Sequence, residues 1–292
     1  MPSHSSEFEN KTLILGIGAQ KSGTTWLYDY LCHRPDVYMH PLKEVHFFDG
    51  IYEAEMWPNV INNRLAKEKK LAARLEKYRS RGDKAKLELY EQVKERNRFY
   101  ENPDLYMEHF RNNVGSCRAF GEITAEYSTL SAESFRIMSK IHPDVRFVLL
   151  LRDPVDRLWS QIKMLSKFER PGFEKKRSLA ERVDTALSRE RIIERSRYDT
   201  TLKNFLTHVP ESRLFVGFFE ELYCDASIQK LCAFLSLPFV PGDYGKLVNE
   251  SRGQTPDRDQ TLKIRARLSD TYDFFIERYG SALPQKWKDY PA

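Results

Sequence analysis

The chain has 292 residues, of which 41% are hydrophobic, so it is long enough to bury a sizeable core and is not a disordered chain. Its 47 basic and 42 acidic residues leave a net charge of +5, too small an excess to indicate a nucleic-acid partner. Four scattered cysteines form no C-x-x-C pair, so zinc and redox motifs are unsupported and a reducing, cytoplasmic compartment is expected. No apolar run approaches the roughly 18 residues of a membrane-spanning helix.

The first predicted unit is a strand, a glycine-rich loop and a helix. Residues 13–17 form a short apolar run that ends at glycines, which predicts a buried strand. Residues 24–33 place Trp26, Leu27 and Leu31 on one helical face. The segment between them therefore lies where phosphate-binding loops lie, between a strand end and a helix N-terminus.

This loop departs from the nucleotide-triphosphate pattern G-x-x-x-x-G-K-[ST] at one position. Gly18 and Gly23 have the required spacing, and Thr25 fills the Ser/Thr position. Thr24 stands where the lysine is expected, and a lysine occurs three residues earlier, at Lys21. The backbone anion cradle is thus kept, while the lysine beside the terminal phosphates is missing.

Two further features of the sequence bear on the anion. Ser22, Thr24 and Thr25 add hydroxyl donors to the loop. The strongest later strand runs into Arg152, so no acidic partner for magnesium is evident at a second strand end. We therefore expect a site that binds an anion without a metal.

A charged segment interrupts the α/β pattern. Residues 64–98 contain 13 Lys and Arg against 6 Asp and Glu, an excess larger than the net charge of the whole chain. A turn at residues 80–83 divides the segment into two predicted helices. It is interpreted as a solvated helical hairpin, which is the usual meaning of a charge run, or as an anion-attracting wall joined by the basic loop at 167–177. We expect one domain over residues 1–292, with a charged helical insertion at about residues 55–112.

Strands and helices alternate again in the second half. Residues 145–151 are almost continuously apolar, as in a parallel strand covered on both faces. Asp153 and Pro154 are suited to the N-cap and first position of the helix that follows. Residues 213–218 predict a third strand and 226–235 a third helix. The pattern predicts an α/β fold, a P-loop-like parallel sheet flanked by helices.

The first loop resembles the 5′-phosphosulfate loop of the sulfotransferases. These enzymes use 3′-phosphoadenosine 5′-phosphosulfate (PAPS) as the donor of a sulfuryl group. The resemblance implies that Lys21 contacts the phosphosulfate and stabilises the departing oxygen. It assigns donor binding to the residues Lys21, Ser22, Gly23, Thr24, Thr25 and Trp26.

Two later segments extend the resemblance. The stretch from Arg152 to Ser160 looks like the 3′-phosphate site of the family, and a guanidinium with a hydroxyl suits a phosphate monoester. The late segment Ser-Arg-Gly-Gln-Thr resembles the loop that closes over the nucleotide, with Arg252 and Gly253 at the matching positions.

The segment Lys-Glu-Val-His-Phe-Phe-Asp at 43–49 is similar to a motif of the carbohydrate sulfotransferases, especially those that act on heparan-type chains. By this resemblance Glu44 is the base, Lys43 helps to hold the sulfuryl group, and His46 is the rival base. Residues 44 and 46 would share a face of an alternating strand. Glu122 either positions the acceptor or caps a strand end.

The resemblance implies sulfuryl transfer from PAPS to a hydroxyl or amine, with a glycan or glycolipid as the favoured acceptor and no metal. Two other functions stay open. A P-loop small-molecule kinase would need magnesium and a lysine at the terminal phosphate, and a non-enzymatic nucleotide- or anion-binding module would bind without transfer.

Overall fold

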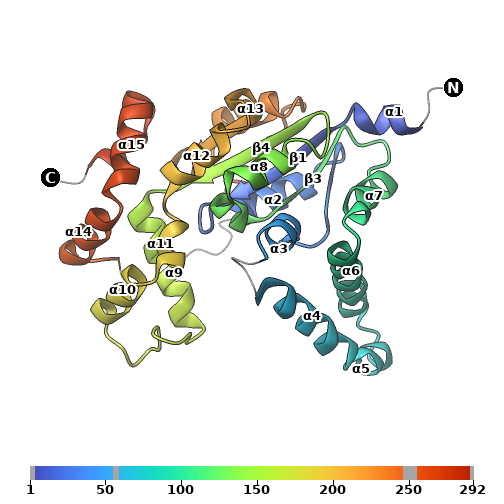
Figure 1. Cartoon of the computed structure of the whole chain (residues 1–292), viewed down its shortest axis with the longest axis horizontal. Coiled ribbons are helices and arrows are strands. Elements are labelled where there is room, and N and C mark those ends of the chain that lie inside the picture. The colour runs from blue at the N-terminus through green and yellow to red at the C-terminus, as the bar shows by residue number, and fades with distance from the viewer. Residues whose placement is uncertain (1–3, 55–58, 246–254, 290–292) are drawn as a thin grey trace.

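A parallel sheet of five strands lies at the centre of the structure, a computed structural model that describes residues 4–54, 59–245 and 255–289 (Figure 1). The strand order is β2-β3-β1-β4-β5, and every neighbouring pair is parallel. The strands are β1 (Thr12–Gly18), β2 (Val37–Met39), β3 (Ala119–Ile123), β4 (Val145–Leu151) and β5 (Leu214–Phe218).

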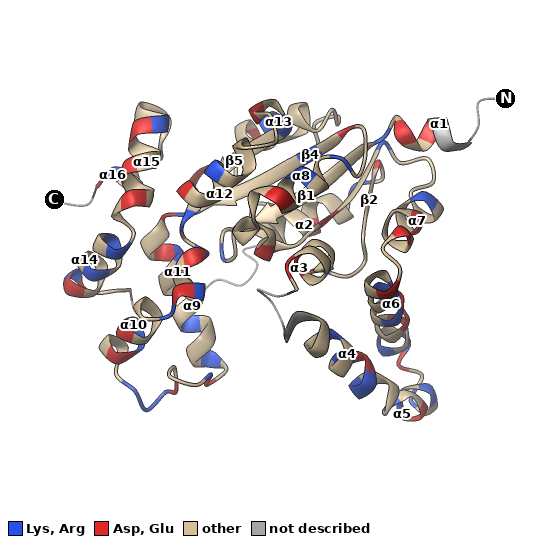
Figure 2. Ribbon diagram, viewed as in Figure 1, with Lys and Arg blue, Asp and Glu red and all other residues tan. Residues whose placement is uncertain are grey.

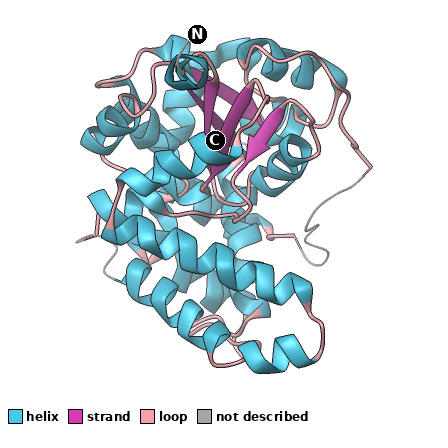
Figure 3. Ribbon diagram, turned by 90° about the vertical axis from the view of Figure 1, so that its right-hand side faces the viewer, coloured by secondary structure: helices cyan, strands magenta, loops and turns pink. Residues whose placement is uncertain are grey.

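Helices connect the strands and cover both faces of the sheet (Figure 3). Those before β4 are α1 (His4–Glu9), α2 (Thr24–Cys32), α3 (Phe47–Tyr52), α4 (Asn59–Ala72), α5 (Leu75–Ser80), α6 (Lys84–Glu101), α7 (Asp104–Asn113), the 3₁₀ turn η1 (Ala125–Thr129) and α8 (Ala132–Met138). Those after β4 are α9 (Pro154–Lys167), α10 (Leu179–Leu187), α11 (Glu190–Glu194), α12 (Tyr198–Leu206), η2 (Glu211–Arg213), η3 (Phe219–Glu221), α13 (Asp225–Phe234), α14 (Arg258–Arg267), α15 (Ser269–Tyr279), η4 (Gly280–Ala282) and α16 (Gln285–Lys288).

The central strand is buried on both sides. All seven residues of β1 are buried. Leu13 and Leu15 pack into one apolar cluster with Phe205 of α12, while Ile14 packs into another with Leu27 of α2 and Leu231 of α13. Because successive side chains of a strand point to opposite faces, this division is what a parallel strand between two helical layers requires.

The strand order fixes the position of the candidate site. From β1 the chain crosses to β2 at one edge of the sheet, and from β4 it crosses to β5 at the opposite edge. β1 and β4 are neighbours, so the crevice outside their carboxyl ends is a topological switch point. Ligands of open α/β sheets bind at such a point, and the loops after β1 and β4 are those that carry Lys21 and Arg152.

The elements predicted from apolar runs are confirmed. β1, α2, β4, β5 and α13 lie where they are expected, with ends that differ by at most one residue. The Asp153 carboxylate accepts the amide N–H of Asp156 at 3.0 Å, and Pro154 is the first residue of α9, so the predicted cap is present. The sequence analysis did not predict β2, β3 or the helices α14 to α16.

The charged segment forms three helices instead of two. A turn at residues 81–82 separates α5 from α6 as expected, but a second break at residues 73–74 divides α4 from α5. α4 packs against α6, and Leu71 and Val93 meet Leu42 in a small apolar cluster of their own. Basic and acidic residues are interspersed along the ribbons of these helices (Figure 2). Within the described ranges, no helix is long and apolar enough to cross a membrane.

Gly121 of β3 lies opposite Ile14 of β1, and this contact generates a prediction about stability. A Cβ atom at residue 121 would lie 1.9 Å from the carbonyl oxygen of Ile14. Gly121→Ala should therefore push the two strands apart and lower the free energy of unfolding by about 3 kcal/mol. Urea denaturation measures this change. Gly245→Ala is the matched control, because its new methyl would meet nothing closer than 3.6 Å, and equal stability of the two variants would contradict the prediction.

Candidate active site

The loop between β1 and α2 takes a backbone path that needs its glycine. Lys21 has a φ of 71°, and Gly23, the N-cap of α2, has a φ of 90°. A Cβ atom at residue 23 would also lie 3.0 Å from Leu222 and 3.2 Å from Phe219. The loop thus turns sharply into the helix N-terminus, which leaves backbone N–H groups facing an anion position.

A cavity with a volume of about 1180 Å³ opens at this loop. Its walls come from the β1–α2 loop, the segment before α3, the end of β4, α9 and the residues after β5. Most of the predicted site residues line it, namely Lys21, Gly23, Thr24, Thr25, Trp26, Lys43, Glu44, Arg152 and Ser160. Residues up to 139 positions apart in the sequence are therefore brought to one cavity.

The remaining predicted residues lie elsewhere. Ser22 is completely buried and does not line the cavity. His46 also lies behind the cavity wall, with 8% of its surface exposed. Arg252 and Gly253 lie outside the described residues.

The cations of the cavity repel one another. Burial lowers the pKa of Lys21 from its usual value, and the charges of Arg152, Arg157 and Lys163 lower it further. A group of like charges that face one cavity is stabilised when an anion enters between them. The electrostatics of this wall therefore suit a ligand with several negative charges.

Arg152 is held at the strand end by a ring and by a distant carboxylate. Its guanidinium carbon lies 4.5 Å from the ring centre of Phe219, and its Nη2 lies 3.5 Å from Asp156 Oδ2. The same Asp156 oxygen accepts a bond of 2.5 Å from Lys286 of α16. Cation–π contact leaves the guanidinium hydrogens free to bind an anion, whereas a strong ion pair would occupy them.

An aromatic surface borders the cavity beside the loop. The indole Nε1–H of Trp26 donates to the carbonyl of Asp243 at 3.0 Å, which fixes the ring. Tyr30 and Tyr244 stack on Trp26 at 5.6 and 6.1 Å, and Tyr223 meets it edge-on at 5.3 Å. Trp26 and Tyr223 both line the cavity, so a flat apolar ligand group has a matching surface there.

The segment that carries Lys43, Glu44 and His46 is a loop, and the expectation of an alternating strand is wrong. Residues 43–46 have no strand partner, and α3 begins directly after them. His46 has a φ of 59°, a left-handed conformation that turns its side chain behind the cavity. Glu44 and His46 nevertheless meet, because this turn folds the imidazole back onto the carboxylate.

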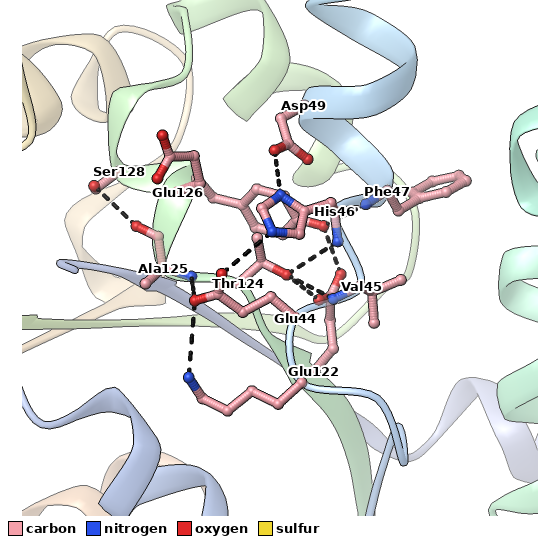
Figure 4. Close-up of polar contacts among 12 residues, drawn as sticks. Glu44, Val45, His46, Phe47, Asp49, Glu122, Thr124, Ala125, Glu126 and Ser128 are labelled. Carbon is pink, nitrogen blue, oxygen red and sulfur yellow. Dashed lines mark hydrogen bonds and ion pairs between the residues drawn. The ribbon is translucent and has the colours of Figure 1, made fainter. Parts of the chain in front are cut away.

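Glu44, His46 and Asp49 form a chain of alternating charges (Figure 4). The imidazole Nε2 lies 3.2 Å from Glu44 Oε2, and its Nδ1 lies 2.6 Å from Asp49 Oδ2. Burial alone would lower the pKa of His46, but the two carboxylates outweigh it and raise the pKa to about 9. Both ring nitrogens are engaged, so His46 is a cation at neutral pH and has no lone pair for a substrate.

Glu44 is ionised at every physiological pH. Burial by itself would raise its pKa, but the hydrogen bond from His46, the charge of Lys43 and the N–H of Ala125 lower the pKa to about 2. The Ala125 N–H donates to Oε1 at 3.1 Å, and the Lys43 ammonium lies 3.8 Å from the same oxygen. The carboxylate therefore faces the cavity as an anion held from three sides.

Several residues of the cavity wall were missed or only partly expected. Lys163 follows Ser160 at helical spacing, so the face of α9 that carries Ser160 could have predicted it. Lys167 and Lys175 belong to the basic loop that one of the two interpretations placed in the wall, and both line the cavity. The helices of residues 64–98 contribute no lining residue within the described chain. Phe219 and Tyr223 had no signal in the sequence.

A match to a protein-family model identifies the family of the chain that forms this cavity. The model of the sulfotransferase family matches residues 14–241, a range that includes the loop after β1, the segment 43–49 and the end of β4. The chain belongs to the sulfotransferase family. Its parallel sheet with a P-loop-like first turn is the fold expected of that family.

Several solved sulfotransferase structures are similar to this chain, and the first of them supports the fold. A sulfotransferase from Alicyclobacillus acidocaldarius is 20% identical, with 95% of this chain and 99% of that chain covered and a TM-score of 0.64. A sulfotransferase domain of the curacin biosynthetic pathway is 14% identical, with coverages of 89% and 98% and a TM-score of 0.47. A mouse sulfotransferase complexed with PAP is 13% identical, with coverages of 97% and 90% and a TM-score of 0.46. No curated protein sequence matches the chain significantly.

The raised pKa of His46 generates a prediction for the sulfotransferase. The imidazole should titrate with a midpoint near pH 9 in an NMR titration. Asp49→Asn should move the midpoint to lower pH, because Glu44 is then the one remaining carboxylate bonded to the ring that opposes the effect of burial. Since the folded pKa lies above the unfolded value of about 6.5, the protonated form stabilises the native state. This contribution is complete below pH 6.5 and is lost as the pH rises to about 9.

The stability of Asp49→Asn checks the same assignment. Urea denaturation at pH 6 and pH 9.5 should show a wild-type advantage that shrinks at the higher pH. A His46 midpoint below pH 7, or a wild-type advantage that grows with pH, would contradict it. His46→Gln identifies the resonance.

Proposed function

We propose that this sulfotransferase moves a sulfuryl group from PAPS to a hydroxyl or amine of an acceptor, with a carbohydrate as the favoured acceptor class. The observation that carries the proposal is the cavity, where a phosphate loop, a second cationic site and an ionised carboxylate share one space. Two separated cationic sites suit a donor with anionic groups at both its 5′ and 3′ positions.

The donor-binding residues follow from the chemistry of PAPS. In this proposal the N–H groups of the loop with Ser22, Thr24 and Thr25 bind the 5′-phosphosulfate. Arg152 and Ser160 bind the 3′-phosphate, at the strand end and two turns into α9. Trp26 offers the adenine a flat surface, and Arg252 and Gly253 would close over the nucleotide. Ser22 joins the donors of the loop only once its N–H leaves the carbonyl of Ala19, to which it donates at 3.3 Å, because its side chain is buried away from the cavity.

The transfer step needs a base, a path for the sulfuryl group and a stabilised leaving group. The acceptor oxygen or nitrogen attacks sulfur, and the bond from sulfur to the bridging phosphate oxygen breaks. 3′-Phosphoadenosine 5′-phosphate (PAP) leaves with that oxygen. The acceptor proton passes to Glu44. Lys21 stabilises the negative charge on the bridging oxygen, and Lys43 stabilises the sulfuryl oxygens.

Glu44 is proposed as the base in preference to His46. Glu44 lines the cavity, whereas His46 does not, and the two nitrogens of His46 are engaged by carboxylates. The pKa of about 2 belongs to the Glu44 carboxylate when no donor is bound. The negative charges of a bound donor raise the pKa of a neighbouring carboxylate, so Glu44 becomes a better proton acceptor when PAPS is in place. His46 then acts by orienting Glu44.

The acceptor class rests on the resemblance of residues 43–49 to the carbohydrate branch. Incubation of the protein with [³⁵S]PAPS and a panel of glucosamine, N-acetylglucosamine oligomers and 4-nitrophenol tests it. Transfer to the sugars above the phenol supports a carbohydrate acceptor, and the reverse order assigns a phenolic acceptor.

The donor site is tested by calorimetry with PAP in EDTA. PAP should bind without any metal, and ATP with magnesium should compete only weakly, because the lysine of the triphosphate loop is displaced to position 21. Arg152→Gln should weaken PAP binding about tenfold or more through loss of a charge-assisted contact. Binding of magnesium–ATP alone would replace sulfuryl transfer with the kinase interpretation.

The catalytic roles are tested by three substitutions. Lys21→Ala should lower the transfer rate at least about 100-fold through loss of stabilisation of the leaving oxygen. Glu44→Gln should lower it by a similar factor through loss of the base while PAP binding is kept. Lys230→Ala, an exposed lysine of α13, is the control. Unchanged turnover in Lys21→Ala or Glu44→Gln would remove the role given to that residue.

A further inference from the structure

Glu122 of β3 is completely buried and does not line the cavity. Three hydroxyl groups donate to its carboxylate. Tyr106 and Tyr127 bond to Oε1 at 3.1 and 2.7 Å, and Thr124 bonds to Oε2 at 2.6 Å. Burying a carboxylate is costly unless such donors satisfy it. The sequence offered two roles for Glu122, and contact with the acceptor is excluded by this burial.

Two of the three hydroxyl oxygens also bind the loop that carries Glu44. The oxygen of Thr124 accepts the backbone N–H groups of Val45 and His46 at 3.1 and 3.3 Å. The oxygen of Tyr127 accepts the N–H groups of Phe47 and Phe48, at 2.8 and 3.4 Å. These are the last donors of the loop and the first donors of α3, which have no partner inside the helix. Figure 4 shows Glu122 and Thr124 against this loop.

We propose that Glu122 is a positioning residue for sulfuryl transfer, which acts through Thr124 and Tyr127 to set where the loop presents Glu44 to the cavity. The inference rests on the proposed function, in which Glu44 is the base. The same segment of chain also holds the carboxylate directly, because the N–H of Ala125 donates to Glu44 Oε1 at 3.1 Å.

The direction of each hydrogen bond explains why a carboxylate is needed. A hydroxyl group has one hydrogen, and Thr124 and Tyr127 each give it to Glu122. Their oxygen lone pairs are then left for the backbone N–H groups of the loop. A residue that donated to these hydroxyls would compete with the loop for the same lone pairs.

The charge state of Glu122 bears directly on this role. Burial raises its pKa to about 7, while the three hydroxyl bonds act in the opposite direction and the carboxylate of Asp49 adds to the rise. The ionised form accepts all three hydrogens. The neutral form must donate one hydrogen of its own, so it disturbs one of the two hydroxyls that hold the loop.

Tyr106 and Tyr127 provide a matched test. Both hydroxyls donate to the same oxygen of Glu122, but only that of Tyr127 contacts the loop. Tyr127→Phe should lower kcat about tenfold or more through displacement of Glu44, with the Kd for PAP unchanged within about threefold. Tyr106→Phe should keep kcat close to that of the wild type. The acceptor is the one that the wild type sulfates fastest in the panel above.

Thr124 and Glu122 give a second comparison. Thr124→Val removes the hydroxyl at nearly constant shape and should lower kcat like Tyr127→Phe, whereas Thr124→Ser should restore most of it. Glu122→Gln should lower kcat without a change in the Kd for PAP, because its amide donates where the hydroxyls must donate.

Amide hydrogen exchange of residues 45–48 measures how well Thr124 and Tyr127 hold the loop, and it needs no acceptor substrate. Exchange should be faster in Tyr127→Phe than in Tyr106→Phe, because only the first loses the oxygen that accepts loop N–H groups. Equal exchange and equal kcat in the two variants would overturn the inference, as would a loss of PAP affinity parallel to kcat. If instead wild-type protein fails to bind PAP, or Glu44→Gln stays active, the proposed function fails, and the exchange result still stands for the loop contact.

Discussion

The pairing of β1 with β3 on one side and β4 on the other is the constraint on which the site depends. β1 is buried over its whole length, and its partners run parallel to it, so three carboxyl ends meet at one edge of the sheet. The phosphate loop, the segment from Thr124 onward and Arg152 all leave from this edge. A rigid edge also allows Lys21 and Gly23 to keep left-handed backbone conformations that a mobile loop would relax.

The cavity has two electrostatic halves with different arrangements. Lys21, Arg152 and Lys163 face one another and oppose each other's charge, which favours the entry of an anion. Glu44 is the reverse case, since Lys43 and His46 compensate its charge before any ligand arrives. A donor with several negative charges is therefore attracted to the first half without being driven against an uncompensated carboxylate in the second.

Much of the sheet could be predicted from the sequence, because long apolar runs carry a strong signal. The strands at β1, β4 and β5 have that signal, whereas β2 has three residues and β3 contains Gly121 and Glu122, which do not fit an apolar or alternating pattern. Glu122 was noticed in the sequence, but its partners Thr124, Tyr127 of η1 and Tyr106 of α7 are brought together only by the tertiary structure.

The candidate site shows the same division between local and tertiary information. The predicted residues of the β1–α2 loop other than Ser22 line the cavity together with Arg152 and Ser160, since motif spacing on a strand–loop–helix unit fixes where they point. The strand expected at Glu44 and His46 is wrong, because the loop there is held by oxygens of Thr124 and Tyr127 instead of a sheet partner. Phe219 and Tyr223 reach the cavity from beyond β5, a proximity that no local pattern records.

The ion pair between Lys286 and Asp156 connects the last helix to the donor side of the cavity. Asp156 lies within reach of both Lys286 and Arg152, at 2.5 and 3.5 Å. Lys286 partly neutralises the charge of Asp156. Asp156 therefore competes less strongly with a bound anion for the guanidinium of Arg152. Lys286 therefore affects the surroundings of Arg152 through Asp156, which lies 130 residues earlier in the sequence, although Lys286 itself does not line the cavity. A substitution of this exposed lysine would change the charge near Arg152 and leave every residue of the cavity wall untouched.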